Sequence, residues 1–324
     1  MASLGDWKVP SAAQPKPQDY PYDLDRALSA VVSVTATIPA DAFTAQTLGT
    51  ERSGHGVQIR DGVVLTIGYL VTEAQSVWLM TGDGRAVEGH VLGYDQVTGF
   101  GLVQALGRLD LPTLELGDSA AAALGERVVV AGAGGRARSI AARIVAKQEF
   151  AGYWEYLLEE AIFTAPAHPH WGGTALINPS GDLVGIGSLQ LQHMGPGGRP
   201  ALINMMVPTD LLKPILDGLM TLGRPDRPAR PWLGLFAAEA EDKVVVAGLA
   251  EGGPADKAGL RVGDAVLAVR GAKIANLAGF FRRVWALGHA GVEVPLTIER
   301  DGRTAEITVP SGDRNAFLKR PLLH

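Results

Sequence analysis

The sequence contains no cysteine in its 324 residues, so disulfide bonds and thiolate metal sites are excluded. It also has no apolar run that approaches the ~20 residues of a membrane-spanning helix. Residues 1–23 have no basic start followed by an apolar core, and they therefore lack the pattern of a secretory signal peptide. These absences leave a chain with no predicted membrane span and no cysteine chemistry.

An excess of positive charge is missing as well. The chain has 29 Lys and Arg against 34 Asp and Glu, a formal net charge of −5 at pH 7. Proteins that bind nucleic acids usually present a basic face, so we expect no nucleic-acid partner. Apolar residues, in contrast, make up 47% of the chain and can form substantial cores, and the length suggests two or three compact units.

Short apolar runs separated by Gly and Asp turns dominate the middle of the chain and predict an all-β fold. They fall into two consecutive sets, which is typical of a double β-barrel. The first set is Val63–Thr66, Ser76–Met80, Ala86–Leu92 and Gly101–Ala105; the second is Arg127–Ala131, Ser139–Gln148, Ala161–Thr164, Ala175–Ile177 and Leu183–Gly187. Apolar residues at helical spacing then predict a closing helix over Thr209–Leu222.

Three prolines, Pro225, Pro228 and Pro231, predict a stiff linker and the clearest domain boundary of the chain. The segment before the first barrel is rich in Pro, Gln and Ser, so we expect it to be flexible or docked on a neighbour. The predicted division is a flexible segment over 1–25, a barrel domain over 26–222, a linker over 223–230, a second domain over 231–312 and a tail over 313–324.

Two stretches of the barrel region carry a specific resemblance. GHGVQIRDGVVLTIGYLV, which starts at Gly54, and HPHWGGTALINPSGDLVGIGS, which starts at His168, resemble the trypsin-like domain of the HtrA/Deg family of PDZ-containing serine proteases. The resemblance implies a trypsin-like double β-barrel followed by an α+β PDZ domain, an all-β dominated fold class.

The same resemblance locates the three positions of a serine-protease triad. Tyr69 stands where the family has its general-base His, Gly99 where it has the orienting Asp, and Gly172 where it has the nucleophilic Ser; a gapped alignment would put Trp171 at that last position. A phenol with a pKa of about 10 is a poor base near neutral pH. Glycine has no side chain, so neither a nucleophile nor an orienting carboxylate is present. We therefore interpret the domain as a pseudoprotease.

After the linker, several segments resemble a PDZ domain of the same family in its order and spacing. Trp232–Leu235 matches the carboxylate-binding loop, and Gly252–Asp264, Val294–Gly302 and Thr304–Val309 match later segments. Consecutive backbone N–H groups in such a loop hold a terminal carboxylate while a sheet edge pairs with the peptide. The predicted peptide-binding residues are Arg230, Trp232, Leu233, Gly234, Leu235, Phe281 and Val284. Phe280, Phe281 and Trp285 have core packing as an equal alternative.

Two further sequence patterns can be interpreted as functional sites or as purely structural features. His168 and His170 can bind a metal or act as a relocated base, but loop histidines without chemistry are the favoured interpretation. The glycine-rich run over 131–135 lacks the helix and acidic partner of a dinucleotide site, so we expect a β-turn. No metal and no cofactor are expected.

These observations predict an inactive HtrA-like pseudoprotease that acts as a peptide- or protein-binding scaffold, a chaperone or a regulatory partner. The alternatives are an active serine endopeptidase with a nonstandard site and, as a weaker one, a metal-assisted hydrolase. The expected partners are peptides or protein C-termini bound through the PDZ domain, an active HtrA relative, and further copies of the chain in a homo-oligomer, a trimer by resemblance. The sequence leaves the compartment unknown: we expect a cytoplasmic protein for the chain as written and a periplasmic one if a leader was removed.

Overall fold

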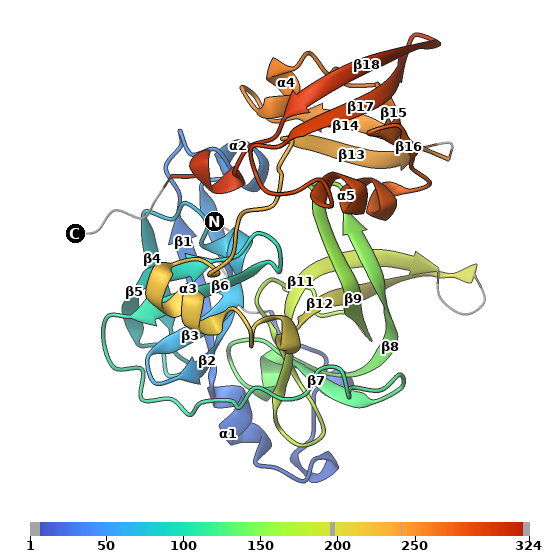
Figure 1. Ribbon diagram of the computed structural model, residues 1–324. Helices are drawn as coiled ribbons and strands as arrows, with labels where there is room; N and C mark the ends of the chain where they lie inside the picture. The colour runs from blue at the N-terminus through green and yellow to red at the C-terminus, as the bar shows by residue number, and fades with distance from the viewer. Residues whose placement is uncertain (1–6, 195–197, 241, 320–324) are drawn as a thin grey trace. The chain divides into compact units, whose positions relative to one another are not determined.

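The computed structural model describes residues 7–194, 198–240 and 242–319 (Figure 1). The chain divides into two compact units. The first consists of residues 1–148, 160–226 and 319–324, and the second consists of residues 149–159 and 227–318. Strands dominate both units, and in the described part of the chain no helix is long and apolar enough to cross a membrane.

The first unit contains two closed six-stranded barrels, as the sequence predicts. In the first barrel the strands follow the order β1-β2-β3-β6-β5-β4, and every pair is antiparallel. Its strands are β1 (Val31–Thr37), β2 (Glu51–Arg60), β3 (Val63–Ile67), β4 (Ser76–Met80), β5 (Ala86–Tyr94) and β6 (Phe100–Ala105). Gly62, at φ +69°, makes the tight turn from β2 to β3.

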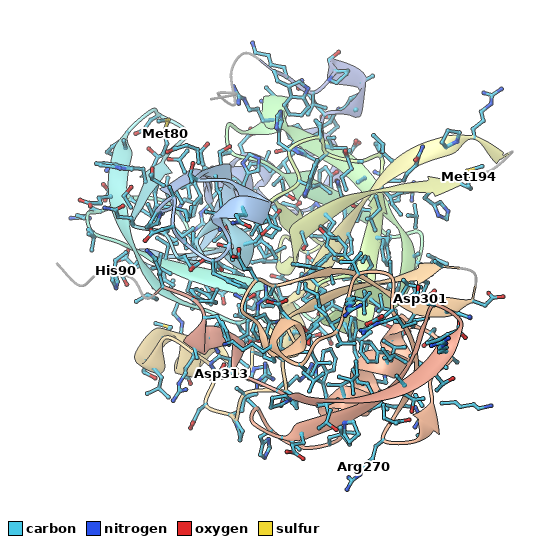
Figure 2. The ribbon with its side chains drawn as sticks, turned by 90° about the horizontal axis from the view of Figure 1, so that it is seen from above. Met80, His90, Met194, Arg270, Asp301 and Asp313 are labelled. Atoms are coloured by element: carbon cyan, nitrogen blue, oxygen red, sulfur yellow. The ribbon has the colours of Figure 1, made fainter. Side chains whose placement is uncertain are left out.

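The second barrel has the order β10-β11-β12-β9-β8-β7 around a core that includes Val128, Ile144 and Val184. Its strands are β7 (Arg127–Ala131), β8 (Ser139–Gly152), β9 (Tyr156–Ala165), β10 (Ala175–Ile177), β11 (Leu183–Met194) and β12 (Pro200–Pro208). The sequence analysis missed β12 and the full length of β8, β9 and β11. Figure 2 shows Met80 and Met194 at the periphery of the ribbon, where their side chains are largely exposed.

The helical segments of the first unit are short. They are η1 (Ser11–Ala13), η2 (Pro17–Asp19), α1 (Leu24–Ser29), α2 (Ala45–Leu48), η3 (Gly68–Leu70), η4 (Arg136–Arg138), η6 (Thr209–Leu211) and α3 (Leu216–Leu222). The continuous helix predicted over Thr209–Leu222 is wrong, because the structure divides it into η6 and α3. Pro214 lies between them, and proline removes a helical N–H donor and disfavours helical backbone at the preceding residue.

The segment that precedes the first barrel contributes a residue to the core of the second barrel. Val9 is buried in the core cluster of the second barrel, and its N–H donates to the Ala137 carbonyl at 2.8 Å. This residue is therefore packed on the second barrel, where its apolar side chain gains from burial.

The second unit is built on an antiparallel sheet in the order β13-β14-β15-β17-β18, with β16 paired to β15. Its elements are β13 (Leu235–Ala240), β14 (Lys243–Leu249), α4 (Pro254–Lys257), β15 (Ala265–Val269), β16 (Ala272–Lys273), α5 (Leu277–Trp285), β17 (Glu293–Arg300), β18 (Arg303–Pro310) and η7 (Arg314–Ala316). Helix α5 begins after its N-cap Asn276, whose side chain accepts a hydrogen bond from the Gly279 N–H at 2.8 Å. α5 packs beside β13 and β15.

Candidate functional site

Tyr69 lies in η3, directly after strand β3 of the first barrel. The buried guanidinium of Arg52 fixes this turn, because its Nη1 atom donates to the Tyr69 carbonyl at 2.7 Å and to the Thr72 carbonyl at 3.1 Å. The Tyr69 hydroxyl donates to the Ser188 carbonyl at 2.9 Å. Tyr69 is thus held both through its backbone carbonyl and through its hydroxyl, and the hydroxyl contacts the second barrel.

Gly172 faces that hydroxyl. A Cβ atom added at Gly172 would lie 2.7 Å from Tyr69 Oη, closer than real Cβ atoms approach another heavy atom. The neighbouring Gly173 has φ +77°, and a Cβ atom there would lie 1.8 Å from the His55 carbonyl oxygen. The His55 N–H in turn donates to the Gly172 carbonyl at 2.8 Å. The loop therefore packs directly on strand β2, and only glycine fits at Gly173.

Gly99 precedes β6 and has φ +89°, a left-handed conformation that favours glycine. Its carbonyl accepts from the Gly68 N–H at 2.6 Å, so it lies beside the residue that precedes Tyr69. The structure thus brings Gly99, Tyr69 and Gly172 into one region of the first unit. Of the three, only Tyr69 supplies a functional side-chain group.

The electrostatics of Tyr69 favour its neutral form. Burial raises the pKa of the phenol well above its ordinary value, and a hydrogen bond with the Trp171 side chain opposes this only in part. A neutral phenol can donate a hydrogen bond but cannot accept a proton from a nucleophile near pH 7. Trp171, the residue before Gly172, is partly buried, and its side chain is the hydrogen-bond partner of the Tyr69 hydroxyl.

His168 is committed to two hydrogen bonds inside the second barrel. Its Nε2 lies 2.9 Å from the Arg138 carbonyl, which requires a proton on Nε2, and its Nδ1 accepts from the His170 N–H at 3.2 Å. Burial lowers the pKa of His168 to about 4, so the ring is neutral at pH 7. Neither nitrogen is left for a metal, and among the described residues no group of three or more His, Cys, Asp or Glu is arranged to hold one.

The sequence analysis did not single out His55, although it joins the two barrels. Its Nδ1 accepts from the Ala133 N–H at 3.1 Å, and its ring lies 5.8 Å from that of His168, edge to face. Burial lowers the pKa of His55 to about 3, and His168 and His170 add to this effect. Its place on a strand gave no sequence signal for this role, because the contact depends on residues 78 positions away.

In the second unit, the backbone N–H groups of Leu233, Gly234 and Leu235 converge on one point. Gly234 has φ +74°, a conformation that lets successive N–H groups face the same side. All three donate to the carboxylate of Glu155: Leu233 to Oε2 at 2.9 Å, Gly234 to Oε1 at 2.8 Å and Leu235 to Oε1 at 3.2 Å. The loop predicted to bind carboxylate therefore holds one from the chain itself, and the sequence analysis missed Glu155.

The other predicted peptide-binding residues also belong to the second unit. Trp232 is buried, pairs with Gly312 through both backbone groups and packs on Phe317 with ring centroids 4.7 Å apart. The Arg230 guanidinium lies 4.6 Å from the centre of the Trp285 ring, a cation–π contact. Phe281 and Val284, each 1% exposed, belong to the core cluster of this unit together with Phe280; Trp285 packs against that cluster.

Comparison with known protein families gives two matches along the chain. Residues 54–186 match the trypsin-like peptidase domain, and residues 231–310 match the PDZ domain. The chain is 28% identical over 265 residues to a protein of Pseudomonas fluorescens named "Probable periplasmic serine endoprotease DegP-like", which covers 78% of this chain and 54% of that protein. It is 26% identical over 274 residues to a protein of Haemophilus influenzae named "Probable periplasmic serine protease do/HhoA-like", covering 79% and 56% of the two chains.

Two solved structures support the fold. The HtrA-type protease AlgW with a decapeptide matches at TM-score 0.55 and 21% identity, over 92% of this chain and 98% of that one. The serine endoprotease from Yersinia pestis matches at TM-score 0.53 and 21% identity, over 90% and 98% of the two chains. The fold class predicted from the sequence is thereby confirmed.

The two barrels carry the match to the peptidase domain, and the second unit carries the match to the PDZ domain. The chain carries a match to the trypsin-like peptidase domain followed by a match to the PDZ domain, and in sequence it resembles DegP-like serine proteases. It spans about half the length of the curated relatives it matches.

Proposed function

We propose that this protein is a catalytically inactive member of the HtrA type that binds peptides or protein C-termini through its PDZ domain. One observation carries the proposal: the Tyr69 hydroxyl lies 2.7 Å from the position of a Cβ atom at Gly172. A serine side chain at this position requires the Tyr69 side chain to shift. The hydroxyl that stands there is neutral and donates to the Ser188 carbonyl, so it is not poised to attack a substrate carbonyl.

The backbone beside Gly172 supports the same conclusion. In a trypsin-like enzyme the oxyanion is held by the N–H of the nucleophile and the N–H two residues earlier. With Gly172 at the nucleophile position, the second donor is the His170 N–H, and this group donates to His168 Nδ1 at 3.2 Å. A donor already engaged within the protein is not preorganised for a transition state, and loss of one such donor reduces turnover by about 10²–10³-fold.

A direct test combines turnover with covalent labelling. The purified full chain is incubated with casein and, separately, with a fluorophosphonate probe, and an active serine protease of the same fold serves as the control. We expect no cleavage above background and no labelled residue. Casein cleavage that copurifies with the chain, with the probe attached to one of its serines, would overturn the proposal.

The alternative of an active endopeptidase with a nonstandard site has support in the names of the relatives, which describe serine endoproteases. The same experiment identifies its nucleophile, because mass spectrometry locates the labelled serine. Ser139 is a poor candidate, since it is buried and its hydroxyl donates to the Gly135 carbonyl at 2.9 Å. The metal-assisted alternative loses one of its two proposed ligands, because both ring nitrogens of His168 are engaged in hydrogen bonds.

The binding role rests on the PDZ match and on the three convergent N–H donors of residues 233–235. As an HtrA-like scaffold the chain would act on a protein partner, such as an active relative, or as a homo-oligomer. Size-exclusion chromatography with light scattering tests the trimer that the resemblance implies.

A further inference from the structure

The tip of the β8–β9 hairpin, residues 149–159, belongs to the second unit, although the strands that carry it belong to the second barrel. We call this segment the tip hairpin. Its turn residue Glu155 has φ +59° and places its carboxylate against the N–H groups of residues 233–235. Arg314 adds a favourable charge interaction with the same carboxylate.

The backbone of the tip hairpin follows the sheet edge. The Ala237 N–H donates to the Tyr153 carbonyl at 2.8 Å, while the Leu235 N–H donates to Glu155. The Ala237 contact is a backbone hydrogen bond and the Leu235 contact is made to the Glu155 side chain, and the two contacts run in antiparallel order along β13. β13 is the first strand of the sheet, so this is the edge at which an added strand pairs.

Side chains complete the contact. Leu157 is 7% exposed and lies in the core cluster that also contains Leu235, Phe281 and Val284. The ends of the tip hairpin, Glu149 and Glu159, both form ion pairs with Arg282 of α5. Carboxylate, strand edge and apolar side chain are the three parts of peptide recognition by a PDZ domain, and residues 153–157 supply all of them.

We infer that the tip hairpin is an internal ligand of the PDZ groove, with the Glu155 side chain in the place of a terminal carboxylate. The inference rests on the proposed peptide-binding function. An external ligand with a free C-terminal carboxylate then binds only by displacing Glu155, so the measured affinity equals the intrinsic affinity multiplied by the open fraction. Because the internal ligand is covalently attached, its effective concentration is high, and weak contacts suffice to hold it.

Docking is tested first, without any peptide, by hydrogen exchange on the full chain. The amides of residues 233–235 and 237 are compared between the wild type and Glu155→Gly. Glycine removes the carboxylate and tolerates the positive φ of the turn, so the hairpin itself is preserved. We expect these amides to be protected in the wild type and to exchange at least tenfold faster in the variant. Equal exchange in both proteins overturns the inference, whatever the peptide results.

Competition is tested second, with decapeptides ending in a free Leu, Val, Ile or Phe and with their amidated forms. We expect Glu155→Gly to bind the free-acid peptides about 10- to 100-fold more tightly than the wild type. The matched control is Glu160→Gln, five residues away, whose carboxylate pairs with Lys147 in the first unit; it should match the wild type.

The outcomes separate the two ideas. Equal, tight binding by the wild type and Glu155→Gly overturns the internal ligand but keeps peptide binding. No binding by any variant, combined with protected amides, overturns peptide binding as the function and supports a groove filled by its own chain. Thermal melting of each variant verifies that the fold is intact.

Discussion

The carboxylate of Glu155 accepts hydrogen bonds from the N–H groups of Leu233 and Gly234 at 2.9 and 2.8 Å, across nearly eighty residues of sequence. Burial raises the pKa of Glu155 to about 7, while those N–H groups and Arg314 favour the charged form. The docked state therefore binds a proton more readily than a free glutamate with a pKa of about 4.3. Proton affinity and hairpin docking are consequently linked.

The first prediction concerns this linkage. A raised pKa in the docked state adds stability below the pKa of the free group, and this contribution is lost as pH rises through about 7. External free-acid peptides should therefore bind the wild type more tightly at pH 8 than at pH 6, measured by fluorescence anisotropy. Glu155→Gln serves as the control, since any pH dependence that remains in it belongs to the peptide. An identical pH profile in both proteins contradicts the prediction.

The second prediction concerns the crowding between Tyr69 and Gly172. Gly172→Ser alone should destabilise the first unit by roughly 1–3 kcal/mol, because the new Cβ atom meets Tyr69 Oη. In the Tyr69→His background, Gly172→Ser should lower the free energy of unfolding by less. Urea unfolding of the single and double variants should therefore give a favourable coupling free energy between the two substitutions. Additive effects would show that the two side-chain positions do not share space.

The third prediction is that Tyr69→His, Gly99→Asp and Gly172→Ser together do not give strong proteolysis. Asp at residue 99 must adopt φ near +89°, which costs roughly 1–2 kcal/mol. The His170 N–H also remains engaged with His168, and Trp171 still occupies the neighbouring position. Casein turnover should rise only after Trp171 is also replaced by a small residue. Efficient cleavage by the triple variant would show that the cleft is preorganised.

The fourth prediction concerns acid stability. His55 and His168 have pKa values of about 3 and 4 in the folded protein, against about 6.5 when unfolded. The unfolded chain then binds more protons below pH 6.5, so each group removes up to ~1.4 kcal/mol of stability per pH unit as pH falls toward the folded value. Urea unfolding between pH 7 and pH 5 should show this loss. His55→Asn, which keeps an acceptor for the Ala133 N–H, should be less stable at pH 7 and less sensitive to acid.

Local features of the fold followed well from the sequence. Strands such as Ser76–Met80, Arg127–Ala131 and Ala175–Ile177 agree with the structure residue for residue, because each apolar run is bounded by polar or glycine residues. The prediction of one helix over Thr209–Leu222 is wrong because the apolar spacing is helical on both sides of Pro214, which interrupts the helix.

The sites were less accessible to sequence reasoning. The position of the N–H donors at 233–235 could be predicted, because a loop motif with Gly234 is local. The carboxylate that these donors bind could not be predicted, since glutamate is a common surface residue and Glu155 reaches the loop only through the tertiary structure. The same holds for His55, whose partners lie on other strands and loops.

The close fit of Gly173 against His55 has a mechanical consequence. His55 belongs to the first barrel, while Gly172 and Gly173 lead into β10 of the second, and a backbone hydrogen bond of 2.8 Å joins them. Because this contact joins the two barrels, partial unfolding of one barrel disrupts the other. The two barrels should consequently unfold in a single cooperative thermal transition. Gly173→Ala should split or broaden that transition while peptide binding by the PDZ domain stays unchanged.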